Sequence, residues 1–465
     1  MRSATDAGHG PGALDPEVTV EDWPLTAADL DPYHDRVERL LEVAGGAASG
    51  GRELPGALAP TAWTTRMAGA ARRRGWTPFA APAALRGDAL APPAAGSVSD
   101  ELLAAAVSSG AVEVRSEATA LEVLVDGDRV RGVRYRRAGR TLEQRARAVV
   151  LAASVFENVR LLLLSRSPAF PAGLANGSGQ VGRHFMAHSV LLVHGLFAGE
   201  DLGRASGTPA QATAIADFDG DAFDHRGLGF VGGSLLQAAM TGPTAPGGGP
   251  LATAPPPGIR PGTPAARRWA ADHGRSVGSV WAQPEQLPRA GHRLDLDPAH
   301  ADPLGRPVLR VTHGLAVDDR RRAAFLAARM GEWLREAGAA RVWTAPLVPQ
   351  PLGTHLYGGA RMGDDPATSV VDADGIAHGR DDLAIVGSST FPTTGGRGPT
   401  QTIEALAWRT AERLAARLGG DGAARPQRAS WTTSPPTTVT SARPSRQASG
   451  GSRSGSTSSA TRSPT

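Results

Sequence analysis

The sequence predicts a mixed α/β fold in two domains, on three observations. Residues 121–165 have the pattern of a β-hairpin, a continuous apolar strand and a helix, the order found in the second half of a dinucleotide-binding domain. Residues 184–345 contain alternating apolar and polar runs between Gly/Pro loops, which is typical of antiparallel sheet. The run 383–387 is again a buried strand, followed by a helix. At 465 residues the chain is also longer than a single hydrophobic core usually grows.

Composition and charge exclude several classes of protein. There is no Cys, which rules out disulfides, thiolate metal ligands and thiol nucleophiles. All 49 basic residues are Arg, and six of them fall in residues 421–465 with a single acid, so residues 1–420 are close to neutral. We therefore expect no nucleic-acid partner. No apolar run reaches the roughly 20 residues that span a bilayer, and residues 1–12 lack the apolar core of a signal peptide. These observations predict a cytoplasmic protein without a membrane span.

The first 98 residues are expected to form one helix and a loosely structured connection. Thr26 can cap a helix over 29–43, where apolar residues recur at helical spacing, and Gly45-Gly46 ends it. Residues 45–98 are rich in Ala, Gly and Pro, with an Arg-bearing helix over 65–74.

The patterns between residues 99 and 183 are sharper. The hairpin turns at Asp126-Gly127-Asp128, and residues 148–153 form a continuous apolar strand that we expect to be buried on both faces, as in a parallel sheet. The remaining elements expected here are a helix over 100–108, a strand over 112–114 and a helix over 157–165.

The sequence pattern changes in the second half of the chain. Strands are expected at 190–197, 294–296 and 308–312, with a long helix over 318–337. A further helix runs over 399–418, with Pro399 in the favoured first position. Residues 421–465 are a Ser/Thr/Pro/Arg/Gly tail that cannot bury enough apolar surface to order itself. The expected domains are 1–98 (helix and connection), 99–183 with 346–420 (dinucleotide-binding), 184–345 (substrate-binding) and 421–465 (disordered tail).

Two local patterns favour structural roles. Gly177-Ser178-Gly179-Gln180-Val181-Gly182 matches GxGxxG, but it follows a helix and a Pro-containing loop where a dinucleotide-binding turn needs a preceding strand. His184 and His188 are four residues apart and could share a helix face as metal ligands. They lack the Glu between them that a zinc protease needs and an obvious third ligand, so we favour structural histidines and expect no metal site.

His355 is the main candidate for chemistry. Taken alone, such a residue is more often a hydrogen-bonded core histidine than a catalytic one. The following Gly358-Gly359 indicates a close approach of backbone to something flat or charged. The strand 383–387 ends at Ser388 shortly before a helix, which supplies donors for a phosphate or a flavin edge. The stretch therefore suits an acid/base group beside a phosphate-bearing cofactor.

At these residues the chain resembles the glucose–methanol–choline (GMC) family of flavin oxidoreductases. The order and spacing of the motifs match the family's C-terminal region: His355-x-x-Gly358-Gly359-x-Arg361-Met362-Gly363, Val386-Gly387-Ser388-Ser389, Phe391-Pro392-Thr393 and Pro399-Thr400. Residues 151–163 and 178–183 look like two further family motifs. Glu157-Asn158 and Val386–Ser389 look most like the sugar and polyol branch, near gluconate and fructose dehydrogenases. The resemblance covers roughly residues 20–420.

The resemblance implies an FAD-dependent enzyme with a Rossmann-like FAD-binding domain. FAD would be the cofactor, and a small-molecule alcohol, sugar or polyol would be oxidised over the flavin, with an electron-acceptor protein as a possible partner. His355 matches the family's active-site His, which takes the hydroxyl proton. Positions that match the cofactor lining are Gly387, Ser388, Pro399 and Thr400, with Ala120 and Ala152 on the adenosine side.

The chain departs from the family pattern at three places. The family begins with a strand–GxGxxG–helix unit, and this sequence starts after it, so the FAD-binding domain is expected to be incomplete. The second active-site residue, usually Asn or His, aligns with Gly398. The Cys-rich loop of the sugar branch is absent near residues 81–95. An alternative expectation is therefore an N-terminally truncated, inactive remnant acting only as a structural or interaction protein, or one half of a split enzyme that needs a complementing N-terminal half.

Overall fold

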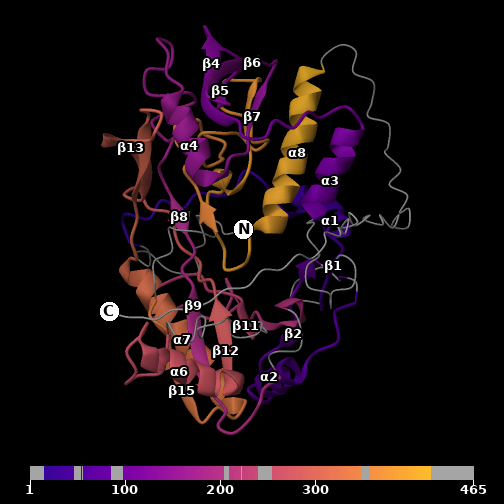
Figure 1. Ribbon diagram of the computed structural model, residues 1–465, viewed down its shortest axis with the longest axis vertical. Helices are drawn as coiled ribbons and strands as arrows, with labels where there is room; N and C mark the ends of the chain where they lie inside the picture. The colour runs from indigo at the N-terminus through magenta and orange to yellow at the C-terminus, as the bar shows by residue number, and fades with distance from the viewer. Residues whose placement is uncertain are drawn as a thin grey trace, which may run out of the picture. The chain divides into compact units, whose positions relative to one another are not determined.

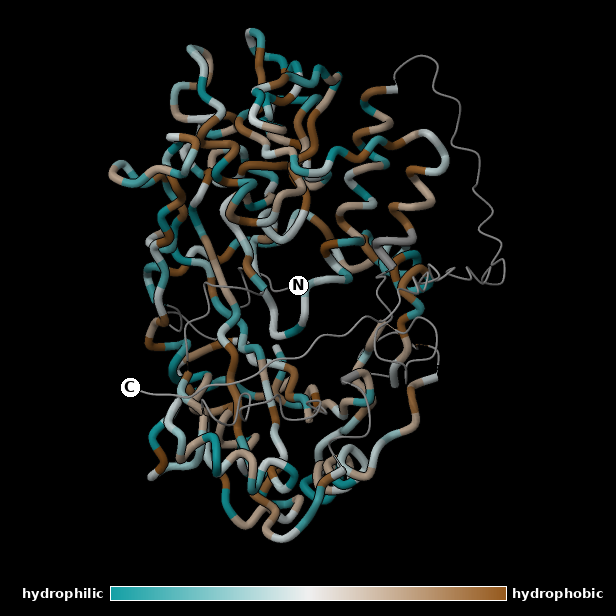
Figure 2. Tube along the Cα trace, in the orientation of Figure 1, coloured by the Kyte–Doolittle hydropathy of each residue, from teal (hydrophilic) through white to brown (hydrophobic). Residues whose placement is uncertain are grey.

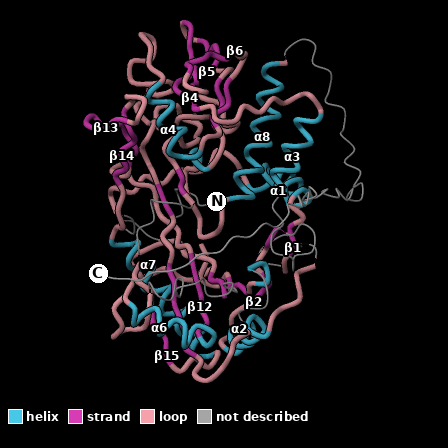
Figure 3. The backbone as a smooth tube through the Cα atoms, viewed as in Figure 1, coloured by secondary structure: helices cyan, strands magenta, loops and turns pink. Residues whose placement is uncertain are grey.

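The computed structural model describes residues 15–46, 54, 56–84, 98–203, 209–220, 222–238, 254–347 and 355–419. The chain divides into two units, residues 1–420 and 421–465, and the second unit lies outside the described residues, as does the tail predicted there. In the first unit, two sets of strands with their helices position the site (Figures 1 and 3).

The first set contains a parallel strand pair formed by two distant stretches of sequence. β7 (Val149–Leu151) pairs in parallel with β17 (Leu383–Ile385), with Val150 opposite Ala384. The hairpin predicted before β7 is present as β4 (Thr119–Asp126) and β5 (Arg129–Arg137), and β6 (Arg140–Arg145) adds a third antiparallel strand. This arrangement confirms the predicted hairpin and the parallel character expected for the strand at 148–153, whose partner was not predicted.

Three helices pack with these strands. α4 (Ser154–Leu164) follows β7 and buries its apolar run, with Val159 and Leu162 fully inside the core. α8 (Thr400–Leu418) is amphipathic, so brown and teal residues alternate along it in Figure 2. It packs on α1 (Ala27–Leu40), which begins with the predicted Thr26 cap, here a capping box with Asp29. α3 is Val98–Ser108.

The second set is a six-stranded antiparallel sheet. Its strand order is β15 (Arg341–Thr344), β9 (Leu191–Leu196), β12 (Val277–Ala282), β11 (Leu236–Ala238), β10 (Thr213–Ile215) and β2 (Pro78–Ala80). α7 (Val317–Glu336) packs against this sheet and against α2 (Ala62–Arg73), where the Trp333 indole donates to the Met67 carbonyl at 2.8 Å. The sheet confirms the predicted antiparallel character of residues 184–345. Because α2 and β2 belong to this core, part of the expected connection is well packed.

Short elements complete the described chain. They are β1 (Val43–Ala44) with β3 (Ala83–Ala84), β8 (Met186–Ala187) with β16 (Leu356–Tyr357), β13 (Arg293–Ala301) with β14 (Pro307–Thr312), and α6 (Pro264–His273).

Three expectations from the sequence were wrong in detail. β7 is not buried on both faces, because Val150 is 48% exposed and β7 pairs only with β17 among the described residues. Residues 112–114 form no strand, since no described strand lies beside them, and Val112 and Val114 are exposed. Pro399 is the residue before α8 and not its first residue.

The GxGxxG stretch has a packing role at its last glycine. Gly182 has φ +89° and donates to the Gly359 carbonyl at 2.7 Å, while its own carbonyl accepts from Leu294. A Cβ at Gly182 would lie 2.1 Å from the Leu294 carbonyl oxygen. The structural role favoured for this stretch therefore has a direct cause, since only glycine allows β13 to approach so closely.

Two alanine substitutions separate this packing role from the motif as a whole. Gly182→Ala combines a left-handed backbone with a backbone collision, so we expect it to lower the free energy of unfolding by about 2–4 kcal/mol. Gly177→Ala is the control, because nothing lies within 4 Å of its Cβ position. Urea unfolding measures both variants. Equal stabilities of the two would contradict the packing role.

Candidate active site

The His355 backbone is held in an unusual conformation by a pairing partner. His355 immediately precedes β16 and has φ +56°, in the left-handed region that side-chain-bearing residues seldom adopt. Its carbonyl accepts from the His188 N–H at 3.1 Å, which continues the pairing of β16 with β8. Such strain persists where the surrounding structure enforces it, and it is common at functional sites.

The segment after His355 is fixed by the turn that follows β17. The N–H groups of Gly358, Ala360 and Met362 donate to the carbonyls of the short helix η4 (Ser388–Thr390) at 3.0, 2.9 and 2.7 Å. The Ser388 hydroxyl donates to the Leu356 carbonyl. At Gly358 a Cβ would lie 2.1 Å from the His184 carbonyl oxygen. At Gly359 a Cβ would lie 2.7 Å from the Val159 side chain. Both glycines therefore allow a close approach, but their neighbours are protein backbone and an apolar side chain and not the flat or charged group that was expected.

Asn158 connects this turn to the end of β7. Its buried side-chain oxygen accepts from the Ala153 N–H at 2.8 Å. Its amide nitrogen donates to the Val386 carbonyl and to the Ser389 hydroxyl, both at 3.0 Å. One side chain thus ties together the carboxyl ends of both parallel strands.

His188 contacts His355 side chain to side chain. The two Nδ1 atoms are 3.2 Å apart, and the rings meet edge to face with centroids 5.3 Å apart. The other ring nitrogen of His188, Nε2, lies 2.8 Å from the Gly395 carbonyl oxygen. No sequence pattern indicates this contact, because the spacing of His184 and His188 suggests a helix face. In the structure His184 lies two residues before the short strand β8 and His188 directly after it.

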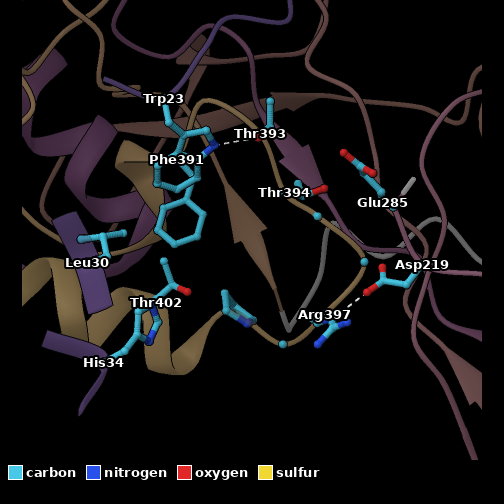
Figure 4. Close-up of a pocket in the computed structure, with 15 residues that line it drawn as sticks. Trp23, Leu30, His34, Asp219, Glu285, Phe391, Thr393, Thr394, Arg397 and Thr402 are labelled. Carbon is cyan, nitrogen blue, oxygen red and sulfur yellow. Dashed lines mark hydrogen bonds and ion pairs between the residues drawn. The ribbon is translucent and has the colours of Figure 1, made fainter. Parts of the chain in front are cut away.

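A cavity of about 450 Å³ opens beside this pair (Figure 4). Trp23 and Phe391 stack edge to face on one wall, and the Trp23 indole donates to the Thr393 hydroxyl at 2.8 Å. On another wall Arg397 forms an ion pair with Asp219. The remaining wall is formed by the glycine-rich loop 395–398 and the start of α8. The residues that line the whole cavity are Trp23, Leu30, His34, Asp219, Gly220, Glu285, Phe391, Thr393, Thr394, Gly395, Gly396, Arg397, Gly398, Pro399 and Thr402.

Gly398 joins this cavity to His355. His355 is not part of the cavity lining, but a Cβ built on Gly398 would lie 3.7 Å from its Cε1 atom, an ordinary van der Waals contact. The structure therefore brings together the two residues predicted to be catalytic. Gly398 itself offers no donor or base, and the space allows a side chain there.

The predicted cofactor positions fall into three places. Ala152 and Gly387-Ser388 directly follow β7 and β17, at the carboxyl ends of the two strands. There the Val386 N–H donates to the Leu151 carbonyl at 2.9 Å. Pro399 and Thr400 form the start of α8 at the cavity. Ala120 lies in β4, and its carbonyl accepts from Arg306 at 3.1 Å.

The residues at the sheet edge and at α8 fit an anionic, flat cofactor. Gly387 has φ +97°, and no atom lies within 4 Å of the position that a Cβ would occupy. α8 has no side-chain cap, so the N–H groups of its first turn are free to bind an anion such as a pyrophosphate. Ala152 to Ser154 are exposed at the same edge. Gly387, Ser388, Pro399 and Thr400 are thus suitable to hold FAD.

Other types of site find no support in the described residues. No group of three or more His, Asp or Glu side chains in this part of the chain could hold a metal ion. No helix within the described ranges is both long and apolar enough to cross a membrane.

Comparisons with known proteins define the class. A family model described as FAD binding domain matches residues 7–187, and one described as GMC oxidoreductase matches residues 288–407. The fold resembles that of pyridoxine 4-oxidase from Mesorbium loti, with a TM-score of 0.51 at 14% identity over 86% of this chain and 82% of that structure. By the two family models, the protein is an FAD-dependent oxidoreductase.

Relatives then identify the family. The 6'''-hydroxyparomomycin C oxidase of Streptomyces lividus is 30% identical over 86% of this chain and 74% of that protein. Paromamine 6'-oxidase of Streptomyces fradiae is 30% identical over 85% and 72%. The gluconate 2-dehydrogenase flavoprotein of Pantoea cypripedii is 27% identical over 89% and 75%. The chain therefore belongs to the GMC oxidoreductase family, in its sugar-dehydrogenase-like branch, and its cofactor is FAD.

Burial of histidines at the site makes stability dependent on pH. Burial lowers the pKa of His184 and of His188 to about 3, whereas an unfolded chain has His pKa values near 6.5. Below pH 6.5 the unfolded chain binds more protons, so the stability present above pH 6.5 is lost as the pH falls towards 3. Each residue should contribute a loss of about 2 kcal/mol between pH 6.5 and pH 5.

Urea unfolding at several pH values tests this dependence. His184→Asn should flatten the slope, because Asn removes the titrating ring and tolerates the left-handed φ of +58° at this position. Gly177→Ala, which leaves every titratable side chain in place, is the control and should leave the slope unchanged. A slope that does not respond to His184→Asn would show that this ring binds its proton equally in the folded and unfolded states.

Proposed function

We propose that the protein oxidises the CH–OH group of an alcohol, sugar or polyol, with His355 accepting the hydroxyl proton. The observation that carries the proposal is the position of His355, whose Cε1 edge faces the cavity wall at Gly398. Bound FAD supplies the acceptor for the hydride. The protein's own part is to bind the alcohol, orient it and remove its proton.

Burial suits His355 to this task. It lowers the pKa of the imidazole below its usual value, so the ring is neutral near pH 7 and can accept a proton. Among the described residues, Nε2 of His355 has no hydrogen-bond partner, while Nδ1 contacts His188. One ring nitrogen is therefore available to a substrate hydroxyl.

The cavity lining supports a polar, hydroxyl-bearing substrate. It combines the ion pair of Asp219 and Arg397 with Thr393, Thr394 and Thr402, next to the aromatic wall of Trp23 and Phe391. Aromatic faces beside hydrogen-bonding groups suit a sugar ring, which has apolar C–H faces and polar edges. Relatives are named for gluconate, 6'''-hydroxyparomomycin C and paromamine, which favours this class here.

The domain organisation supports the same function. We infer that residues 99–183 and 346–420 form the FAD-binding domain, because β7 and β17 come from these two stretches. Residues 184–345 supply most of the antiparallel sheet of the substrate-binding domain, to which residues 78–80 add the edge strand β2.

Substitution of His355 tests the proposed role. His355→Ala should slow substrate-driven bleaching of the flavin absorbance by about 10²–10⁴-fold, the range expected for loss of a general base. Gluconate, fructose and simple polyols form the first substrate panel, under anaerobic conditions. His300→Ala is the matched control and should bleach at the wild-type rate. Equal rates for His355→Ala and wild type would remove His355 from the role, and FAD-loaded wild type that no substrate bleaches would favour a non-catalytic protein.

A second candidate function is suggested by the open edge of β7. The backbone N–H and C=O groups of Val149 and Leu151 point to β17, so the backbone groups of Val150 point to the opposite side of β7. The Val150 side chain is 48% exposed. An exposed strand edge with an apolar side chain is a template for another strand. We propose that the strand of a βαβ unit can dock at this edge, next to the FAD site.

Co-expression tests this docking. With a separate βαβ segment taken from a relative, the protein should retain more FAD on purification than it does alone. Val150→Asp should remove this gain, because it places a charge at the edge. Val311→Asp, at another exposed strand valine on β14, is the control. Equal FAD content with and without the segment would argue against docking.

A further inference from the structure

The proton on the His188 ring can be placed from its two neighbours. Nε2 of His188 lies 2.8 Å from the Gly395 carbonyl oxygen, and a carbonyl can only accept. Nε2 therefore carries a hydrogen and donates it. His188 is also almost completely buried, which disfavours the charged ring, so its Nδ1 carries an unshared electron pair.

The contact between the two rings then determines the proton position on His355. The Nδ1 atoms of His188 and His355 are 3.2 Å apart, a distance at which two unprotonated nitrogens would repel each other. One proton must lie between them. Since Nδ1 of His188 is unprotonated, Nδ1 of His355 is the donor, and in the neutral ring Nε2 of His355 carries the electron pair.

We propose that His188 is a positioning residue that fixes the tautomer of His355, so that Nε2 is the basic nitrogen presented to the substrate. The inference rests on the proposed role of His355 as the base. It assigns to a buried histidine, 167 positions away in the sequence, control over which nitrogen of His355 can accept a proton.

The other groups around the pair are compatible with this assignment. The Tyr357 hydroxyl lies 3.4 Å from Nδ1 and 3.5 Å from Nε2 of His188, too long to compete with the 3.2 Å contact. No carboxylate within the described part of the chain bonds to either ring. The pair is thus an uncharged relay in which a carbonyl orients one imidazole and that imidazole orients the next.

The same contact connects the base to the cavity wall. Gly395, the acceptor for His188, begins the loop 395–398 that lines the cavity and ends at Gly398 beside His355. His188 therefore holds the proton acceptor and the substrate-facing loop in one arrangement. A shift of the loop would break the bond that sets the tautomer.

The direct test is the ¹⁵N chemical shift of the His355 ring, measured on ¹⁵N-histidine protein with and without added FAD. In the wild type, Nε2 of His355 should have the shift of an unprotonated nitrogen and Nδ1 that of a protonated one. His188→Phe, which keeps the ring but not the acceptor, should populate the opposite tautomer. His188→Asn, which retains an acceptor oxygen, should largely restore the wild-type pattern, and Tyr357→Phe is the control expected to leave it unchanged.

Kinetics provide the second readout. The wild-type rate of flavin bleaching should fall as the pH drops through the lowered pKa of His355. His188→Phe should reduce the plateau rate roughly tenfold or more, as other losses of a catalytic His tautomer do, and His188→Asn should recover most of it.

If His188→Phe fails to fold, the ¹⁵N chemical shifts of His355 in the wild type and in His188→Asn decide which nitrogen carries the proton. A protonated Nε2 in the wild type, or the same shifts and plateau rate in His188→Phe, would overturn the inference. Failure of His355→Ala to slow bleaching would instead overturn the proposed function and leave the tautomer assignment intact.

Discussion

The buried amide of Asn158 is the interaction on which the rest of the site depends. It bonds to the backbone after β7 and after β17 and to the Ser389 hydroxyl, so it holds the ends of two strands that pair across more than half of the chain. The η4 turn held in this way in turn pairs with residues 358–362, which places His355. An unpaired buried amide costs far more than a satisfied one contributes, so the arrangement is specific as well as stable.

Much of the fold could be predicted from local patterns, and the rest could not for identifiable reasons. α1, α4 and α8, the β4–β5 hairpin and the antiparallel sheet follow from periodicity, capping and turn residues that act within a few positions. Periodicity cannot say what covers a strand, so it assigned burial to Val150 and a strand to residues 112–114.

The candidate site shows the same division. His355 and Gly398 were predicted from motif spacing and family resemblance, and the structure places them next to each other. His188 could not be found, because its role arises from a contact that pairs β8 with β16 and from a carbonyl in the cavity loop. The functions of Asn158 and Gly182 likewise depend on partners far away in the sequence. Contacts of this kind arise from the tertiary fold, and they cannot be predicted from the residue types alone.

The glycines of the cavity loop also bear on how such a site can diversify. At Gly396 any side chain would collide, since a Cβ would lie 2.5 Å from the Asp219 carboxylate and 2.7 Å from the Ser234 backbone. At Gly398 a Cβ meets the His355 ring at 3.7 Å and nothing closer. A side chain is therefore excluded at 396 but fits at 398, two residues further along the same loop. A single codon change at 398 can therefore place a new functional group beside the histidine without repacking the loop, which gives evolution an inexpensive route to altered activity.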